Sequence, residues 1–373
     1  MSTSGKILVV SGIYAPDIGG PATYIPQICH YLVKNGFEVS LVSLEGTRES
    51  KRNFEPWKRS FILRNTTKLR RILSTIWLLL KESSGCKAVF SNGLFEEVAL
   101  LKIMRPKIYC VAKIVGDPVW ERNRNSTASS VGIEDFNQGK LSIKNLLQRY
   151  ALTWSLNQFN EITCPSTQLA KIIKGWGVHV PITVIQNGIR CHEIVNVNKQ
   201  YDVVSVSRLV PWKNLDKLIL ACSRNNLSLA ICGEGPEMSK LEMIANEFKA
   251  RVEFLGMMDE KRVMEVLNKS NVFALISSYE GLSFALLEAM MAGKRILVSS
   301  CEGNTDVVQH GVTGIVVNAN EQRALDISLL DLVKNDPLGT KLALNAHVEA
   351  KANYCADKQL SLMLNLITGS LKK

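Results

Sequence analysis

Short apolar segments alternate with helical stretches along the whole chain, and this alternation restricts the possible folds more than any other feature. In the first half the strand-like segments are Lys6–Ser11, Glu38–Ser43, Ala88–Ser91, Ile108–Ile114 and Ile162–Pro165, with helical periodicity at Pro21–Lys34 and Leu141–Asn160. Short apolar strands separated by amphipathic helices are typical of parallel sheets covered on both faces. The pattern predicts an α/β domain with a doubly wound parallel sheet.

The same alternation restarts after a polar stretch around residues 187–200. Its strand-like segments are Tyr201–Ser205, Ser228–Cys232, Val252–Leu255, Val272–Ile276 and Arg295–Ser299, and its helices are Asn214–Ser223, Pro236–Lys249, Glu260–Lys269 and Ser283–Ala292. A chain of 373 residues suits two such domains. We predict an N-terminal domain over 1–187, a C-terminal domain over 196–352, and a final helix over 353–373 that packs back toward the N-terminal domain. Ligands of such sheets bind beyond the carboxyl ends of the strands, and a cleft between two domains adds to that opportunity.

Composition argues against several classes of protein. No segment has the roughly 18 uninterrupted apolar residues of a membrane span, and the run Ile7–Val10 is too short for a signal peptide. The nine cysteines are scattered without a Cys-x-x-Cys pair, which is typical of buried thiols in a reducing compartment. The five histidines are equally dispersed, so we expect no metal site. From the membrane, signal-peptide and cysteine observations we expect a cytoplasmic location.

The net charge of +11 is confined to the first half of the chain. Residues 1–180 hold 24 Lys and Arg against 13 Asp and Glu, whereas residues 181–373 hold 21 of each. The excess is densest in a basic stretch made of Arg48, Lys51, Arg52, Lys58, Arg59, Arg64, Lys68, Arg70 and Arg71. Such a patch attracts a polyanion or an anionic membrane face.

A glycine-rich turn, Tyr14-Ala-Pro-Asp-Ile-Gly-Gly-Pro21, follows the first strand and precedes the first helix. Gly19 and Gly20 let the backbone approach a ligand, and the start of the helix offers free N–H groups to an anion. The spacing is not that of a dinucleotide-binding fingerprint. An ordinary turn between strand and helix explains the glycines equally well.

Two basic residues lie in the loop after the first strand of the second domain, Val206-Ser-Arg-Leu-Val-Pro-Trp-Lys-Asn214. Arg208 and Lys213 can neutralise a diphosphate, the first as a planar fork and the second as a point charge. Isolated basic residues are more often solvated surface charges, but a place at a strand's carboxyl end favours binding.

Two glutamates flank a predicted helix start in the segment Ser277-Ser-Tyr-Glu-Gly-Leu-Ser-Phe-Ala-Leu-Leu-Glu288. Ser283 can cap the helix, which leaves the N–H groups of residues 281–283 free for phosphate. Glu280 and Glu288 add a carboxylate on either side, and carboxylates accept hydrogen bonds from sugar hydroxyls. Taken singly, each glutamate is more often a loop or surface charge.

A second pair of glycines lies in Cys232-Gly-Glu-Gly-Pro236, between a strand and a helix. Gly233 and Gly235 suit a close approach of the backbone to a ligand. A plain turn explains them nearly as well.

Together these four stretches resemble glycosyltransferase family 4, whose members have the GT-B architecture of two Rossmann-like domains facing across a cleft. The resemblance is carried by Pro16–Gly20, Ser207–Leu209 with Lys213, Gly233–Pro236, and the pair Glu280 and Glu288 with seven residues between. It implies a retaining, metal-independent, hexosyltransferase-type enzyme that uses a nucleotide diphosphate sugar. It also implies that the first domain binds the acceptor and the second the donor.

The resemblance implies a role for each matching residue. Arg208 and Lys213 bind the donor diphosphate and stabilise the leaving group, and Glu280 reaches the donor sugar. Glu288 binds the ribose hydroxyls. The remaining substrate-binding residues are Gly281, Leu282 and Ser283, whose amides meet sugar and phosphate, and Asp17, Gly19, Gly20, Gly233 and Gly235, which line the cleft.

The histidine that many members place after a middle strand of the N-terminal domain has no counterpart here. The matching segment, Ala112–Arg122, contains no histidine. We assign Asp117 as the catalytic candidate at that place, with Lys113 as a substrate-binding residue and Glu121 nearby. Asp-Pro is also a common turn signal, which explains Asp117 without a catalytic role.

Aromatic and apolar residues accompany the basic stretch, in particular Trp57, Phe61 and the run 72–80. Basic residues beside a Trp-containing helix suit an anionic membrane face. A simpler interpretation makes the buried face of a core helix from Leu73, Ile76, Trp77 and Leu80, and we expect both to hold. The segment Arg48–Leu80 is thus expected to hold the protein on the inner face of the cytoplasmic membrane.

The expected acceptor is a polyprenyl-diphosphate-linked sugar or another glycan of bacterial surface polysaccharide, such as lipopolysaccharide. A nucleotide-sugar epimerase of the same architecture and a catalytically silent nucleotide-sugar-binding partner remain alternatives. We expect no nucleic-acid partner, because aromatic residues do not interleave with the basic ones across a sheet face and no recognition motif is present.

Overall fold

A computed structural model of the chain describes residues 5–14, 17, 20–46, 55–127, 132–191, 193–195 and 197–369. It divides into two compact units. Unit 1 comprises Met1–Asn123, Glu134–Gln186 and Gln359–Lys373, and unit 2 comprises Arg124–Ile133 and Asn187–Lys358. Residues 124–133, which the sequence pattern placed in the N-terminal domain, are therefore grouped with unit 2.

Unit 1 contains a seven-stranded sheet in which all neighbouring strands are parallel. Its spatial order is β3 (Lys58–Leu63), β2 (Glu38–Glu45), β1 (Lys6–Ser11), β4 (Cys86–Asn92), β5 (Tyr109–Lys113), β6 (Glu161–Cys164) and β7 (Ile182–Val184). The sequence order reverses beside β1, and such a reversal opens a crevice at the carboxyl ends of the strands.

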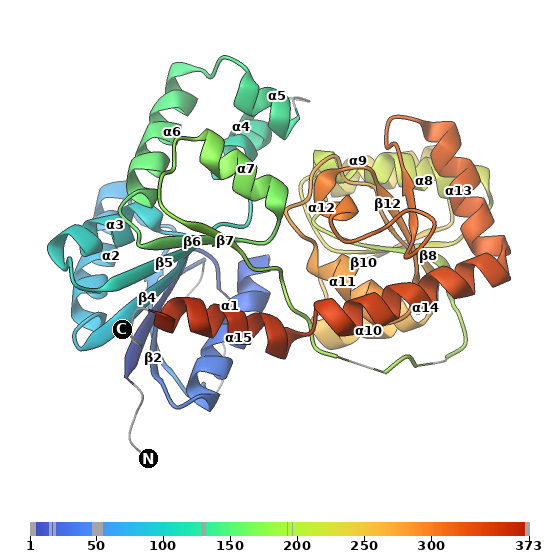
Figure 1. The fold of residues 1–373 in the computed structure, drawn as a ribbon. Coiled ribbons are helices and arrows are strands. Elements are labelled where there is room, and N and C mark those ends of the chain that lie inside the picture. Colours follow the sequence, from blue (N-terminus) through green and yellow to red (C-terminus); the bar gives the residue numbers. More distant parts are fainter. Residues whose placement is uncertain are drawn as a thin grey trace. The chain divides into compact units, whose positions relative to one another are not determined.

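The helices of unit 1 connect these strands. They are α1 (Gly20–Lys34), α2 (Lys68–Glu82), α3 (Phe95–Met104), α5 (Ile133–Gln138), α6 (Ile143–Leu156) and α7 (Thr167–Gly175), while α4 (Pro118–Thr127) and α15 (Ala356–Thr368) each straddle the unit boundary. Figure 1 shows their places along the chain. Serine side chains start two of them, because Ser142 Oγ accepts from Asn145 N at 3.3 Å and Ser166 Oγ from Leu169 N at 3.2 Å.

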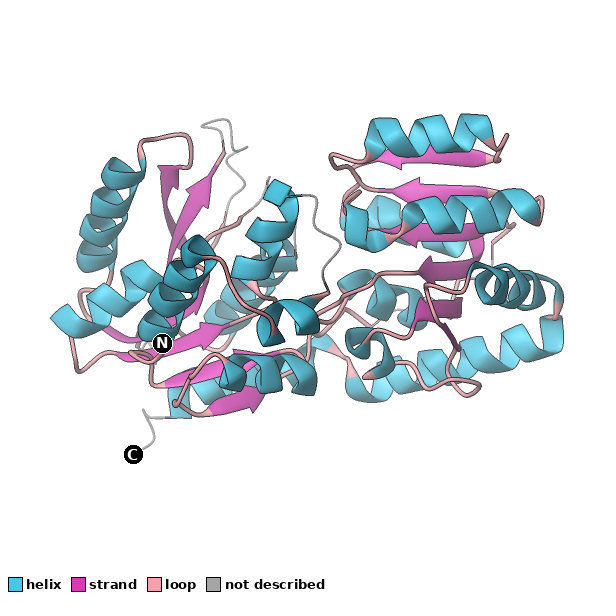
Figure 2. Cartoon of the chain, turned by 90° about the horizontal axis from the view of Figure 1, so that it is seen from above, coloured by secondary structure: helices cyan, strands magenta, loops and turns pink. Residues whose placement is uncertain are grey.

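Unit 2 contains a six-stranded sheet, also parallel throughout. Its order is β10 (Val252–Gly256), β9 (Leu229–Cys232), β8 (Tyr201–Val206), β11 (Ser270–Leu275), β12 (Arg295–Ser299) and β13 (Ile315–Val317). Its helices are the 3₁₀ turn η1 (Pro211–Lys213), α8 (Leu215–Arg224), α9 (Met238–Glu247), α10 (Glu260–Asn268), α11 (Phe284–Met291), α12 (Glu302–Thr305), α13 (Gln322–Lys334) and α14 (Asp336–Asn353). In Figure 2 the strands of each unit are flanked by helices.

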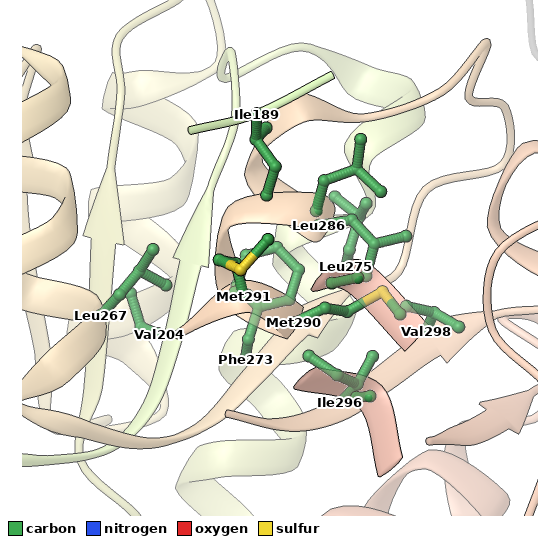
Figure 3. Close-up of a cluster of buried hydrophobic side chains, with 14 of the residues drawn as sticks. Ile189, Val204, Leu267, Phe273, Leu275, Leu286, Met290, Met291, Ile296 and Val298 are labelled. Carbon is green, nitrogen blue, oxygen red and sulfur yellow. The ribbon is translucent and has the colours of Figure 1, made fainter. Parts of the chain in front are cut away.

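Strand β11 shows why both faces of the unit 2 sheet are covered. Phe273 and Leu275 point into a core that includes Met290 and Met291 of α11, drawn in Figure 3. Val272 and Ala274 alternate with these two residues along the strand and belong to the core on the other face. Because side chains alternate along a strand, a run that is apolar at every position is buried on both sides. Full burial of a side chain such as Phe273 contributes about 1.5–3 kcal/mol.

The prediction of two doubly wound sheets is confirmed. The structure adds three strands that the sequence pattern did not indicate, β3, β7 and β13. All three lie at a sheet edge. Edge strands are short or polar on one side, so their sequences lack the continuous apolar run of a central strand.

One pair of cysteines departs from the expected pattern of buried thiols. Cys191 and Cys355 form a disulfide with a Cα–Cα distance of 5.8 Å, beside an isolated bridge between Ile189 and Cys355. The two cysteines are 164 residues apart, so their spacing gave no sign of the pairing. The other seven are free thiols, and all except Cys301 are buried.

Candidate functional site

The loops after β8 and β11 form the centre of the candidate site in unit 2. Because these strands are parallel neighbours, their carboxyl ends lie side by side at one edge of the sheet. The backbone N–H of Ser278 donates to Trp212 O at 2.8 Å, and Asn214 Nδ2 donates to Ile276 O at 2.7 Å. The two loops are thus fixed to each other before any ligand binds.

Lys213 and Glu280, both predicted site residues, are brought together by these loops. Lys213 Nζ lies 2.5 Å from Glu280 Oε1, and Ser277 Oγ donates to the same oxygen at 2.6 Å. The side chains are only 13% and 9% exposed, so the pair is largely screened from solvent. An ammonium held in this way is preorganised for a second anion, such as a phosphate.

Gly281, Leu282 and Ser283 connect Glu280 to α11, which begins at Phe284. Ser283 caps the helix as predicted, with Oγ accepting from Leu286 N at 3.3 Å. Within the described part of the chain, the N–H groups of Gly281 and Leu282 have no hydrogen-bond partner. Free N–H groups at a helix start, with the positive end of the helix dipole, form an anion site.

Glu288 lies on α11, partly buried. Burial raises its pKa to about 8, and the nearby carboxylate of Glu260 adds to the shift. The side chain is therefore largely protonated at neutral pH and can donate as well as accept a hydrogen bond. Such a group suits a sugar hydroxyl, which also has both capacities.

Arg208 differs from Lys213 in being exposed. Its guanidinium carbon lies 5.7 Å from the centroid of the Trp212 ring, which supports the side chain without covering its donors. Among the residues that the structure describes, no carboxylate forms an ion pair with it. The guanidinium is thus available to a ligand.

Gly233 and Gly235 have a packing role. A Cβ at Gly233 would collide with the carbonyl oxygen of Ser207, and one at Gly235 with that of Leu209. Gly233 also has a φ of +134°, which few other residues adopt. The contact between the loops after β8 and β9 therefore requires glycine at both positions, and their approach to a ligand stays a prediction.

Several residues that support the Glu280 loop were not predicted from the sequence. Ser299 Oγ donates to Ser277 O at 2.5 Å, and Asn304 Nδ2 donates to Ser299 Oγ at 3.0 Å. Gly303 packs against the backbone of Glu280 so closely that a Cβ would collide with its carbonyl oxygen. The only signal for them was a small polar segment after a strand, residues 299–305, which is common in ordinary turns.

The predicted site residues of unit 1 belong to an earlier part of the sequence and to a different sheet from these loops. Asp17 forms an ion pair with Arg64, Oδ2 to Nη2 2.6 Å, and Arg64 also donates to Gly12 O at 3.1 Å. Gly20 is the exposed first residue of α1. Gly19 lies outside the described residues.

Asp117 and Lys113 are both buried in unit 1. Asp117 is 0% exposed, and its carboxylate accepts from Val119 N, from Asn137 Nδ2 and from Arg149 Nη2, the last at 2.5 Å. The carboxylate thus caps α4 and pairs with α6, and the catalytic role of Asp117 stays a prediction.

Lys113 is 1% exposed. Its Nζ lies 4.2 Å from the centroid of the Tyr24 ring, and burial lowers its pKa to about 7. Its role as a substrate-binding residue stays a prediction.

Much of the described basic stretch is used inside unit 1. Arg48, Lys51 and Arg52 lie outside the described residues. Three described members of the stretch form ion pairs. These pairs are Lys58 with Glu82 at 2.8 Å, Arg59 with Glu45 at 2.7 Å, and Arg64 with Asp17. These cations are internally neutralised, so the stretch offers less positive charge to a partner than its sequence suggested.

The helix within that stretch is not buried as the simpler interpretation expected. On α2, Thr75 and Leu79 are buried, whereas Leu73 and Trp77 are exposed. The prediction that Leu73 and Trp77 belong to a core face is therefore wrong. No helix among the described residues is long and apolar enough to cross a membrane.

Two family models match successive parts of the chain. Residues 18–193 match "Glycosyltransferase Family 4", and residues 192–348 match "Glycosyl transferases group 1". The first match covers β2 to β7, and the second covers the loops that carry Arg208, Lys213, Glu280 and Glu288.

Individual relatives agree with the family models. An uncharacterized glycosyltransferase of Methanocaldococcus jannaschii is 29% identical over 158 residues, 40% of each chain. The N,N'-diacetylbacillosaminyl-diphospho-undecaprenol alpha-1,3-N-acetylgalactosaminyltransferase of Campylobacter jejuni is 25% identical over 176 residues, 45% of this chain and 46% of the relative. The chain thus spans less than half the length of these two curated relatives.

A solved structure shows the same fold over the full chain. The crystal structure of Anabaena HepE in complex with UDP and glucose superposes with a TM-score of 0.79 at 16% identity, covering 98% of this chain and 100% of that one. With two Rossmann-like sheets, both family models and this neighbour in agreement, the chain belongs to glycosyltransferase family 4 and is a glycosyltransferase of the GT-B fold.

Proposed function

We propose that the enzyme transfers a hexosyl group from a nucleoside diphosphate sugar with retention of configuration and without a metal ion. The observation that carries the proposal is the Lys213–Glu280 pair beside the free N–H groups of Gly281 and Leu282, just before α11. This arrangement supplies one preorganised positive charge and a fixed dipole at one place, which suits the diphosphate of such a donor.

The proposed chemistry divides among the residues of unit 2. Lys213 and Arg208 neutralise the charge that develops on the departing diphosphate, a task that a metal ion performs in other enzymes. Glu280, released from Lys213 when phosphate binds, accepts hydrogen bonds from the donor sugar. Glu288 holds the ribose.

We propose a lipid-linked acceptor of the polyprenyl diphosphate type, in the assembly of a surface polysaccharide. The Campylobacter jejuni relative supports this, because its name specifies a diphospho-undecaprenol acceptor. The surplus positive charge of residues 1–180 also supports it, because it attracts an anionic acceptor and the anionic inner face of the cytoplasmic membrane.

Thermal shift against a panel of nucleoside diphosphates and their sugars tests the donor site. A ligand that binds only the folded protein raises its melting temperature, so the correct donor stands out from the panel. We expect Arg208→Ala, Lys213→Ala and Glu288→Ala each to abolish the shift, while Lys240→Ala, which alters a surface pair with Glu237, retains it.

Two results would contradict the proposal. If Lys213→Ala keeps the full donor-induced shift, the diphosphate lies elsewhere. If the enzyme converts the donor to another sugar nucleotide without an acceptor, the chain is an epimerase, since a transferase alone shows at most slow hydrolysis.

A further inference from the structure

Helix α6 is oriented with its polar side chains inward and its apolar side chains outward. The exposed fractions of Ile143, Leu147 and Tyr150 are 79%, 64% and 72%, and Leu146 is 57% exposed. Asn145, Arg149 and Ser155 are buried on the opposite side, together with Leu152 and Leu156. Globular helices normally present the reverse arrangement, so this face needs an explanation.

Specific polar contacts fix the inverted orientation. Arg149 forms the buried ion pair with Asp117, and its guanidinium carbon lies 4.2 Å from the centroid of the Trp176 ring. Asn145 Nδ2 donates to Asn123 Oδ1 at 2.9 Å. Rotating the helix to bury its apolar side would break these contacts and leave a charge unpaired, which is costly. The outward apolar face is therefore a stable property of unit 1.

The exposed side chains form one continuous stripe. Ile143, Leu147, Tyr150 and Trp154 are spaced three or four residues apart, so they lie on the same side of the helix. Trp154 is less exposed, at 39%, and lies near the end of the helix. Tyrosine and tryptophan beside aliphatic residues are typical of side chains that occupy a membrane–water interface.

The charge around the stripe is positive. No Asp or Glu occurs between residues 136 and 160, and Lys140 and Lys144 flank the stripe and are exposed. Along α6 itself, an anionic surface would therefore meet cations and no carboxylate. A second copy of the chain would bring these lysines against each other, which disfavours self-association through this face.

A neighbouring helix repeats the arrangement. Helix α3 packs against both α2 and α6, so the three helices lie in one layer of unit 1 (Figure 1). On α2, Leu69, Leu73 and Trp77 are exposed at intervals of four residues, and Lys81 Nζ lies 5.3 Å from the Trp77 ring centroid. Two helices of one layer thus each present an apolar stripe with lysines.

We propose that the outward apolar face of α6, with the exposed stripe of α2, docks the protein on an anionic lipid bilayer. Apolar side chains enter the interfacial region while the lysines contact anionic headgroups. The docking deepens the proposed function and rests on its lipid-linked acceptor, because such an acceptor lies in a bilayer.

Sedimentation of the full chain with vesicles tests the proposal. We expect binding to vesicles that contain phosphatidylglycerol and little binding to pure phosphatidylcholine. The variant Leu146→Gln/Leu147→Gln should lower the partition coefficient about tenfold or more, since binding scales with the apolar area buried. The control Leu344→Gln/Leu362→Gln makes the same change at exposed leucines of α14 and α15 and should bind as the unaltered protein does.

Three outcomes overturn the proposal. The first is that the unaltered protein stays in the supernatant. The second is that the α6 variant sediments as the unaltered protein does. The third is that sedimentation velocity shows a dimer that the α6 variant abolishes. The melting temperature of each variant confirms that it is folded, which the exposure of the altered leucines predicts. The donor-induced thermal shift should be equal in the unaltered protein and the α6 variant. If the unaltered protein shows no such shift with any donor, the proposed function is refuted, while the docking result is unaffected.

Discussion

The raised pKa of Glu288 predicts a pH dependence of stability that a single substitution removes. The unfolded chain releases the proton near pH 4.5, whereas the folded chain holds it to about pH 8. Between these values the folded state binds more protons, so its stability falls as the pH rises, and the loss is complete above pH 8. The slope is at most about 1.4 kcal/mol per pH unit and falls to half of that at the folded-state pKa, which gives about 2 kcal/mol between pH 6 and pH 8.

The variant Glu288→Gln lacks this titration and should gain stability over the unaltered protein as the pH rises. For a unit of this size, about 2 kcal/mol corresponds to a melting-temperature difference of about 4–8 °C between pH 6 and pH 8. Differential scanning fluorimetry across that range measures it, and the difference between the two proteins cancels all other titrations. Glu247→Gln, at an exposed position on α9, is the matched control and should follow the unaltered protein. Parallel profiles for Glu288→Gln and the unaltered protein would refute the reasoning.

Three further predictions concern the reaction and the two units. Excess EDTA should change the transfer rate by less than about twofold, because side chains and amides neutralise the diphosphate, and a larger loss restored by Mg²⁺ contradicts this. Asp117→Asn should destabilise unit 1 by about 3 kcal/mol through the uncompensated buried Arg149, and Asp117→Asn/Arg149→Met should recover part of that loss in urea unfolding. Gly233→Ala should prevent unit 2 from folding, since its Cβ collides with Ser207, whereas Gly311→Ala, whose Cβ meets no atom within 4 Å, should cost about 1 kcal/mol, as circular dichroism and proteolysis would report.

The central strands could be predicted from the sequence because most of their positions are apolar. The prediction of Arg295–Ser299 coincides with β12, and that of Val272–Ile276 differs from β11 by two residues at its start and one at its end. The edge strand β10 was predicted, whereas the edge strands β3, β7 and β13 were not. The strand β3 begins with Lys58 and Arg59, so its sequence was interpreted as part of a charged surface stretch.

The donor-side residues could be predicted because they lie at the carboxyl ends of strands, where ligands of parallel sheets bind. Arg208, Lys213 and Glu280 follow strands that are neighbours in the sheet, so placement at a strand's end also placed them together. Asp117 follows a strand end as well, but its partner Arg149 is 32 residues away on α6. Pairings at such distances in the sequence, like that of Cys191 with Cys355, are set by tertiary packing.

The orientation of α6 could not be predicted for a related reason. Its sequence has an apolar and a polar side, and the ordinary expectation places the apolar side inward. The buried ion pair of Arg149 with Asp117 favours the opposite orientation, because turning the apolar side inward would leave the buried Asp117 carboxylate without its partner.

A crystal structure with the donor identified by thermal shift, or with its nucleoside diphosphate, tests the central claim most directly. We predict that a phosphate oxygen lies within hydrogen-bond distance of Lys213 Nζ and of an N–H at the start of α11, with the ribose at Glu288. A diphosphate bound away from the loops after β8 and β11, with Lys213 still paired to Glu280, would contradict the account.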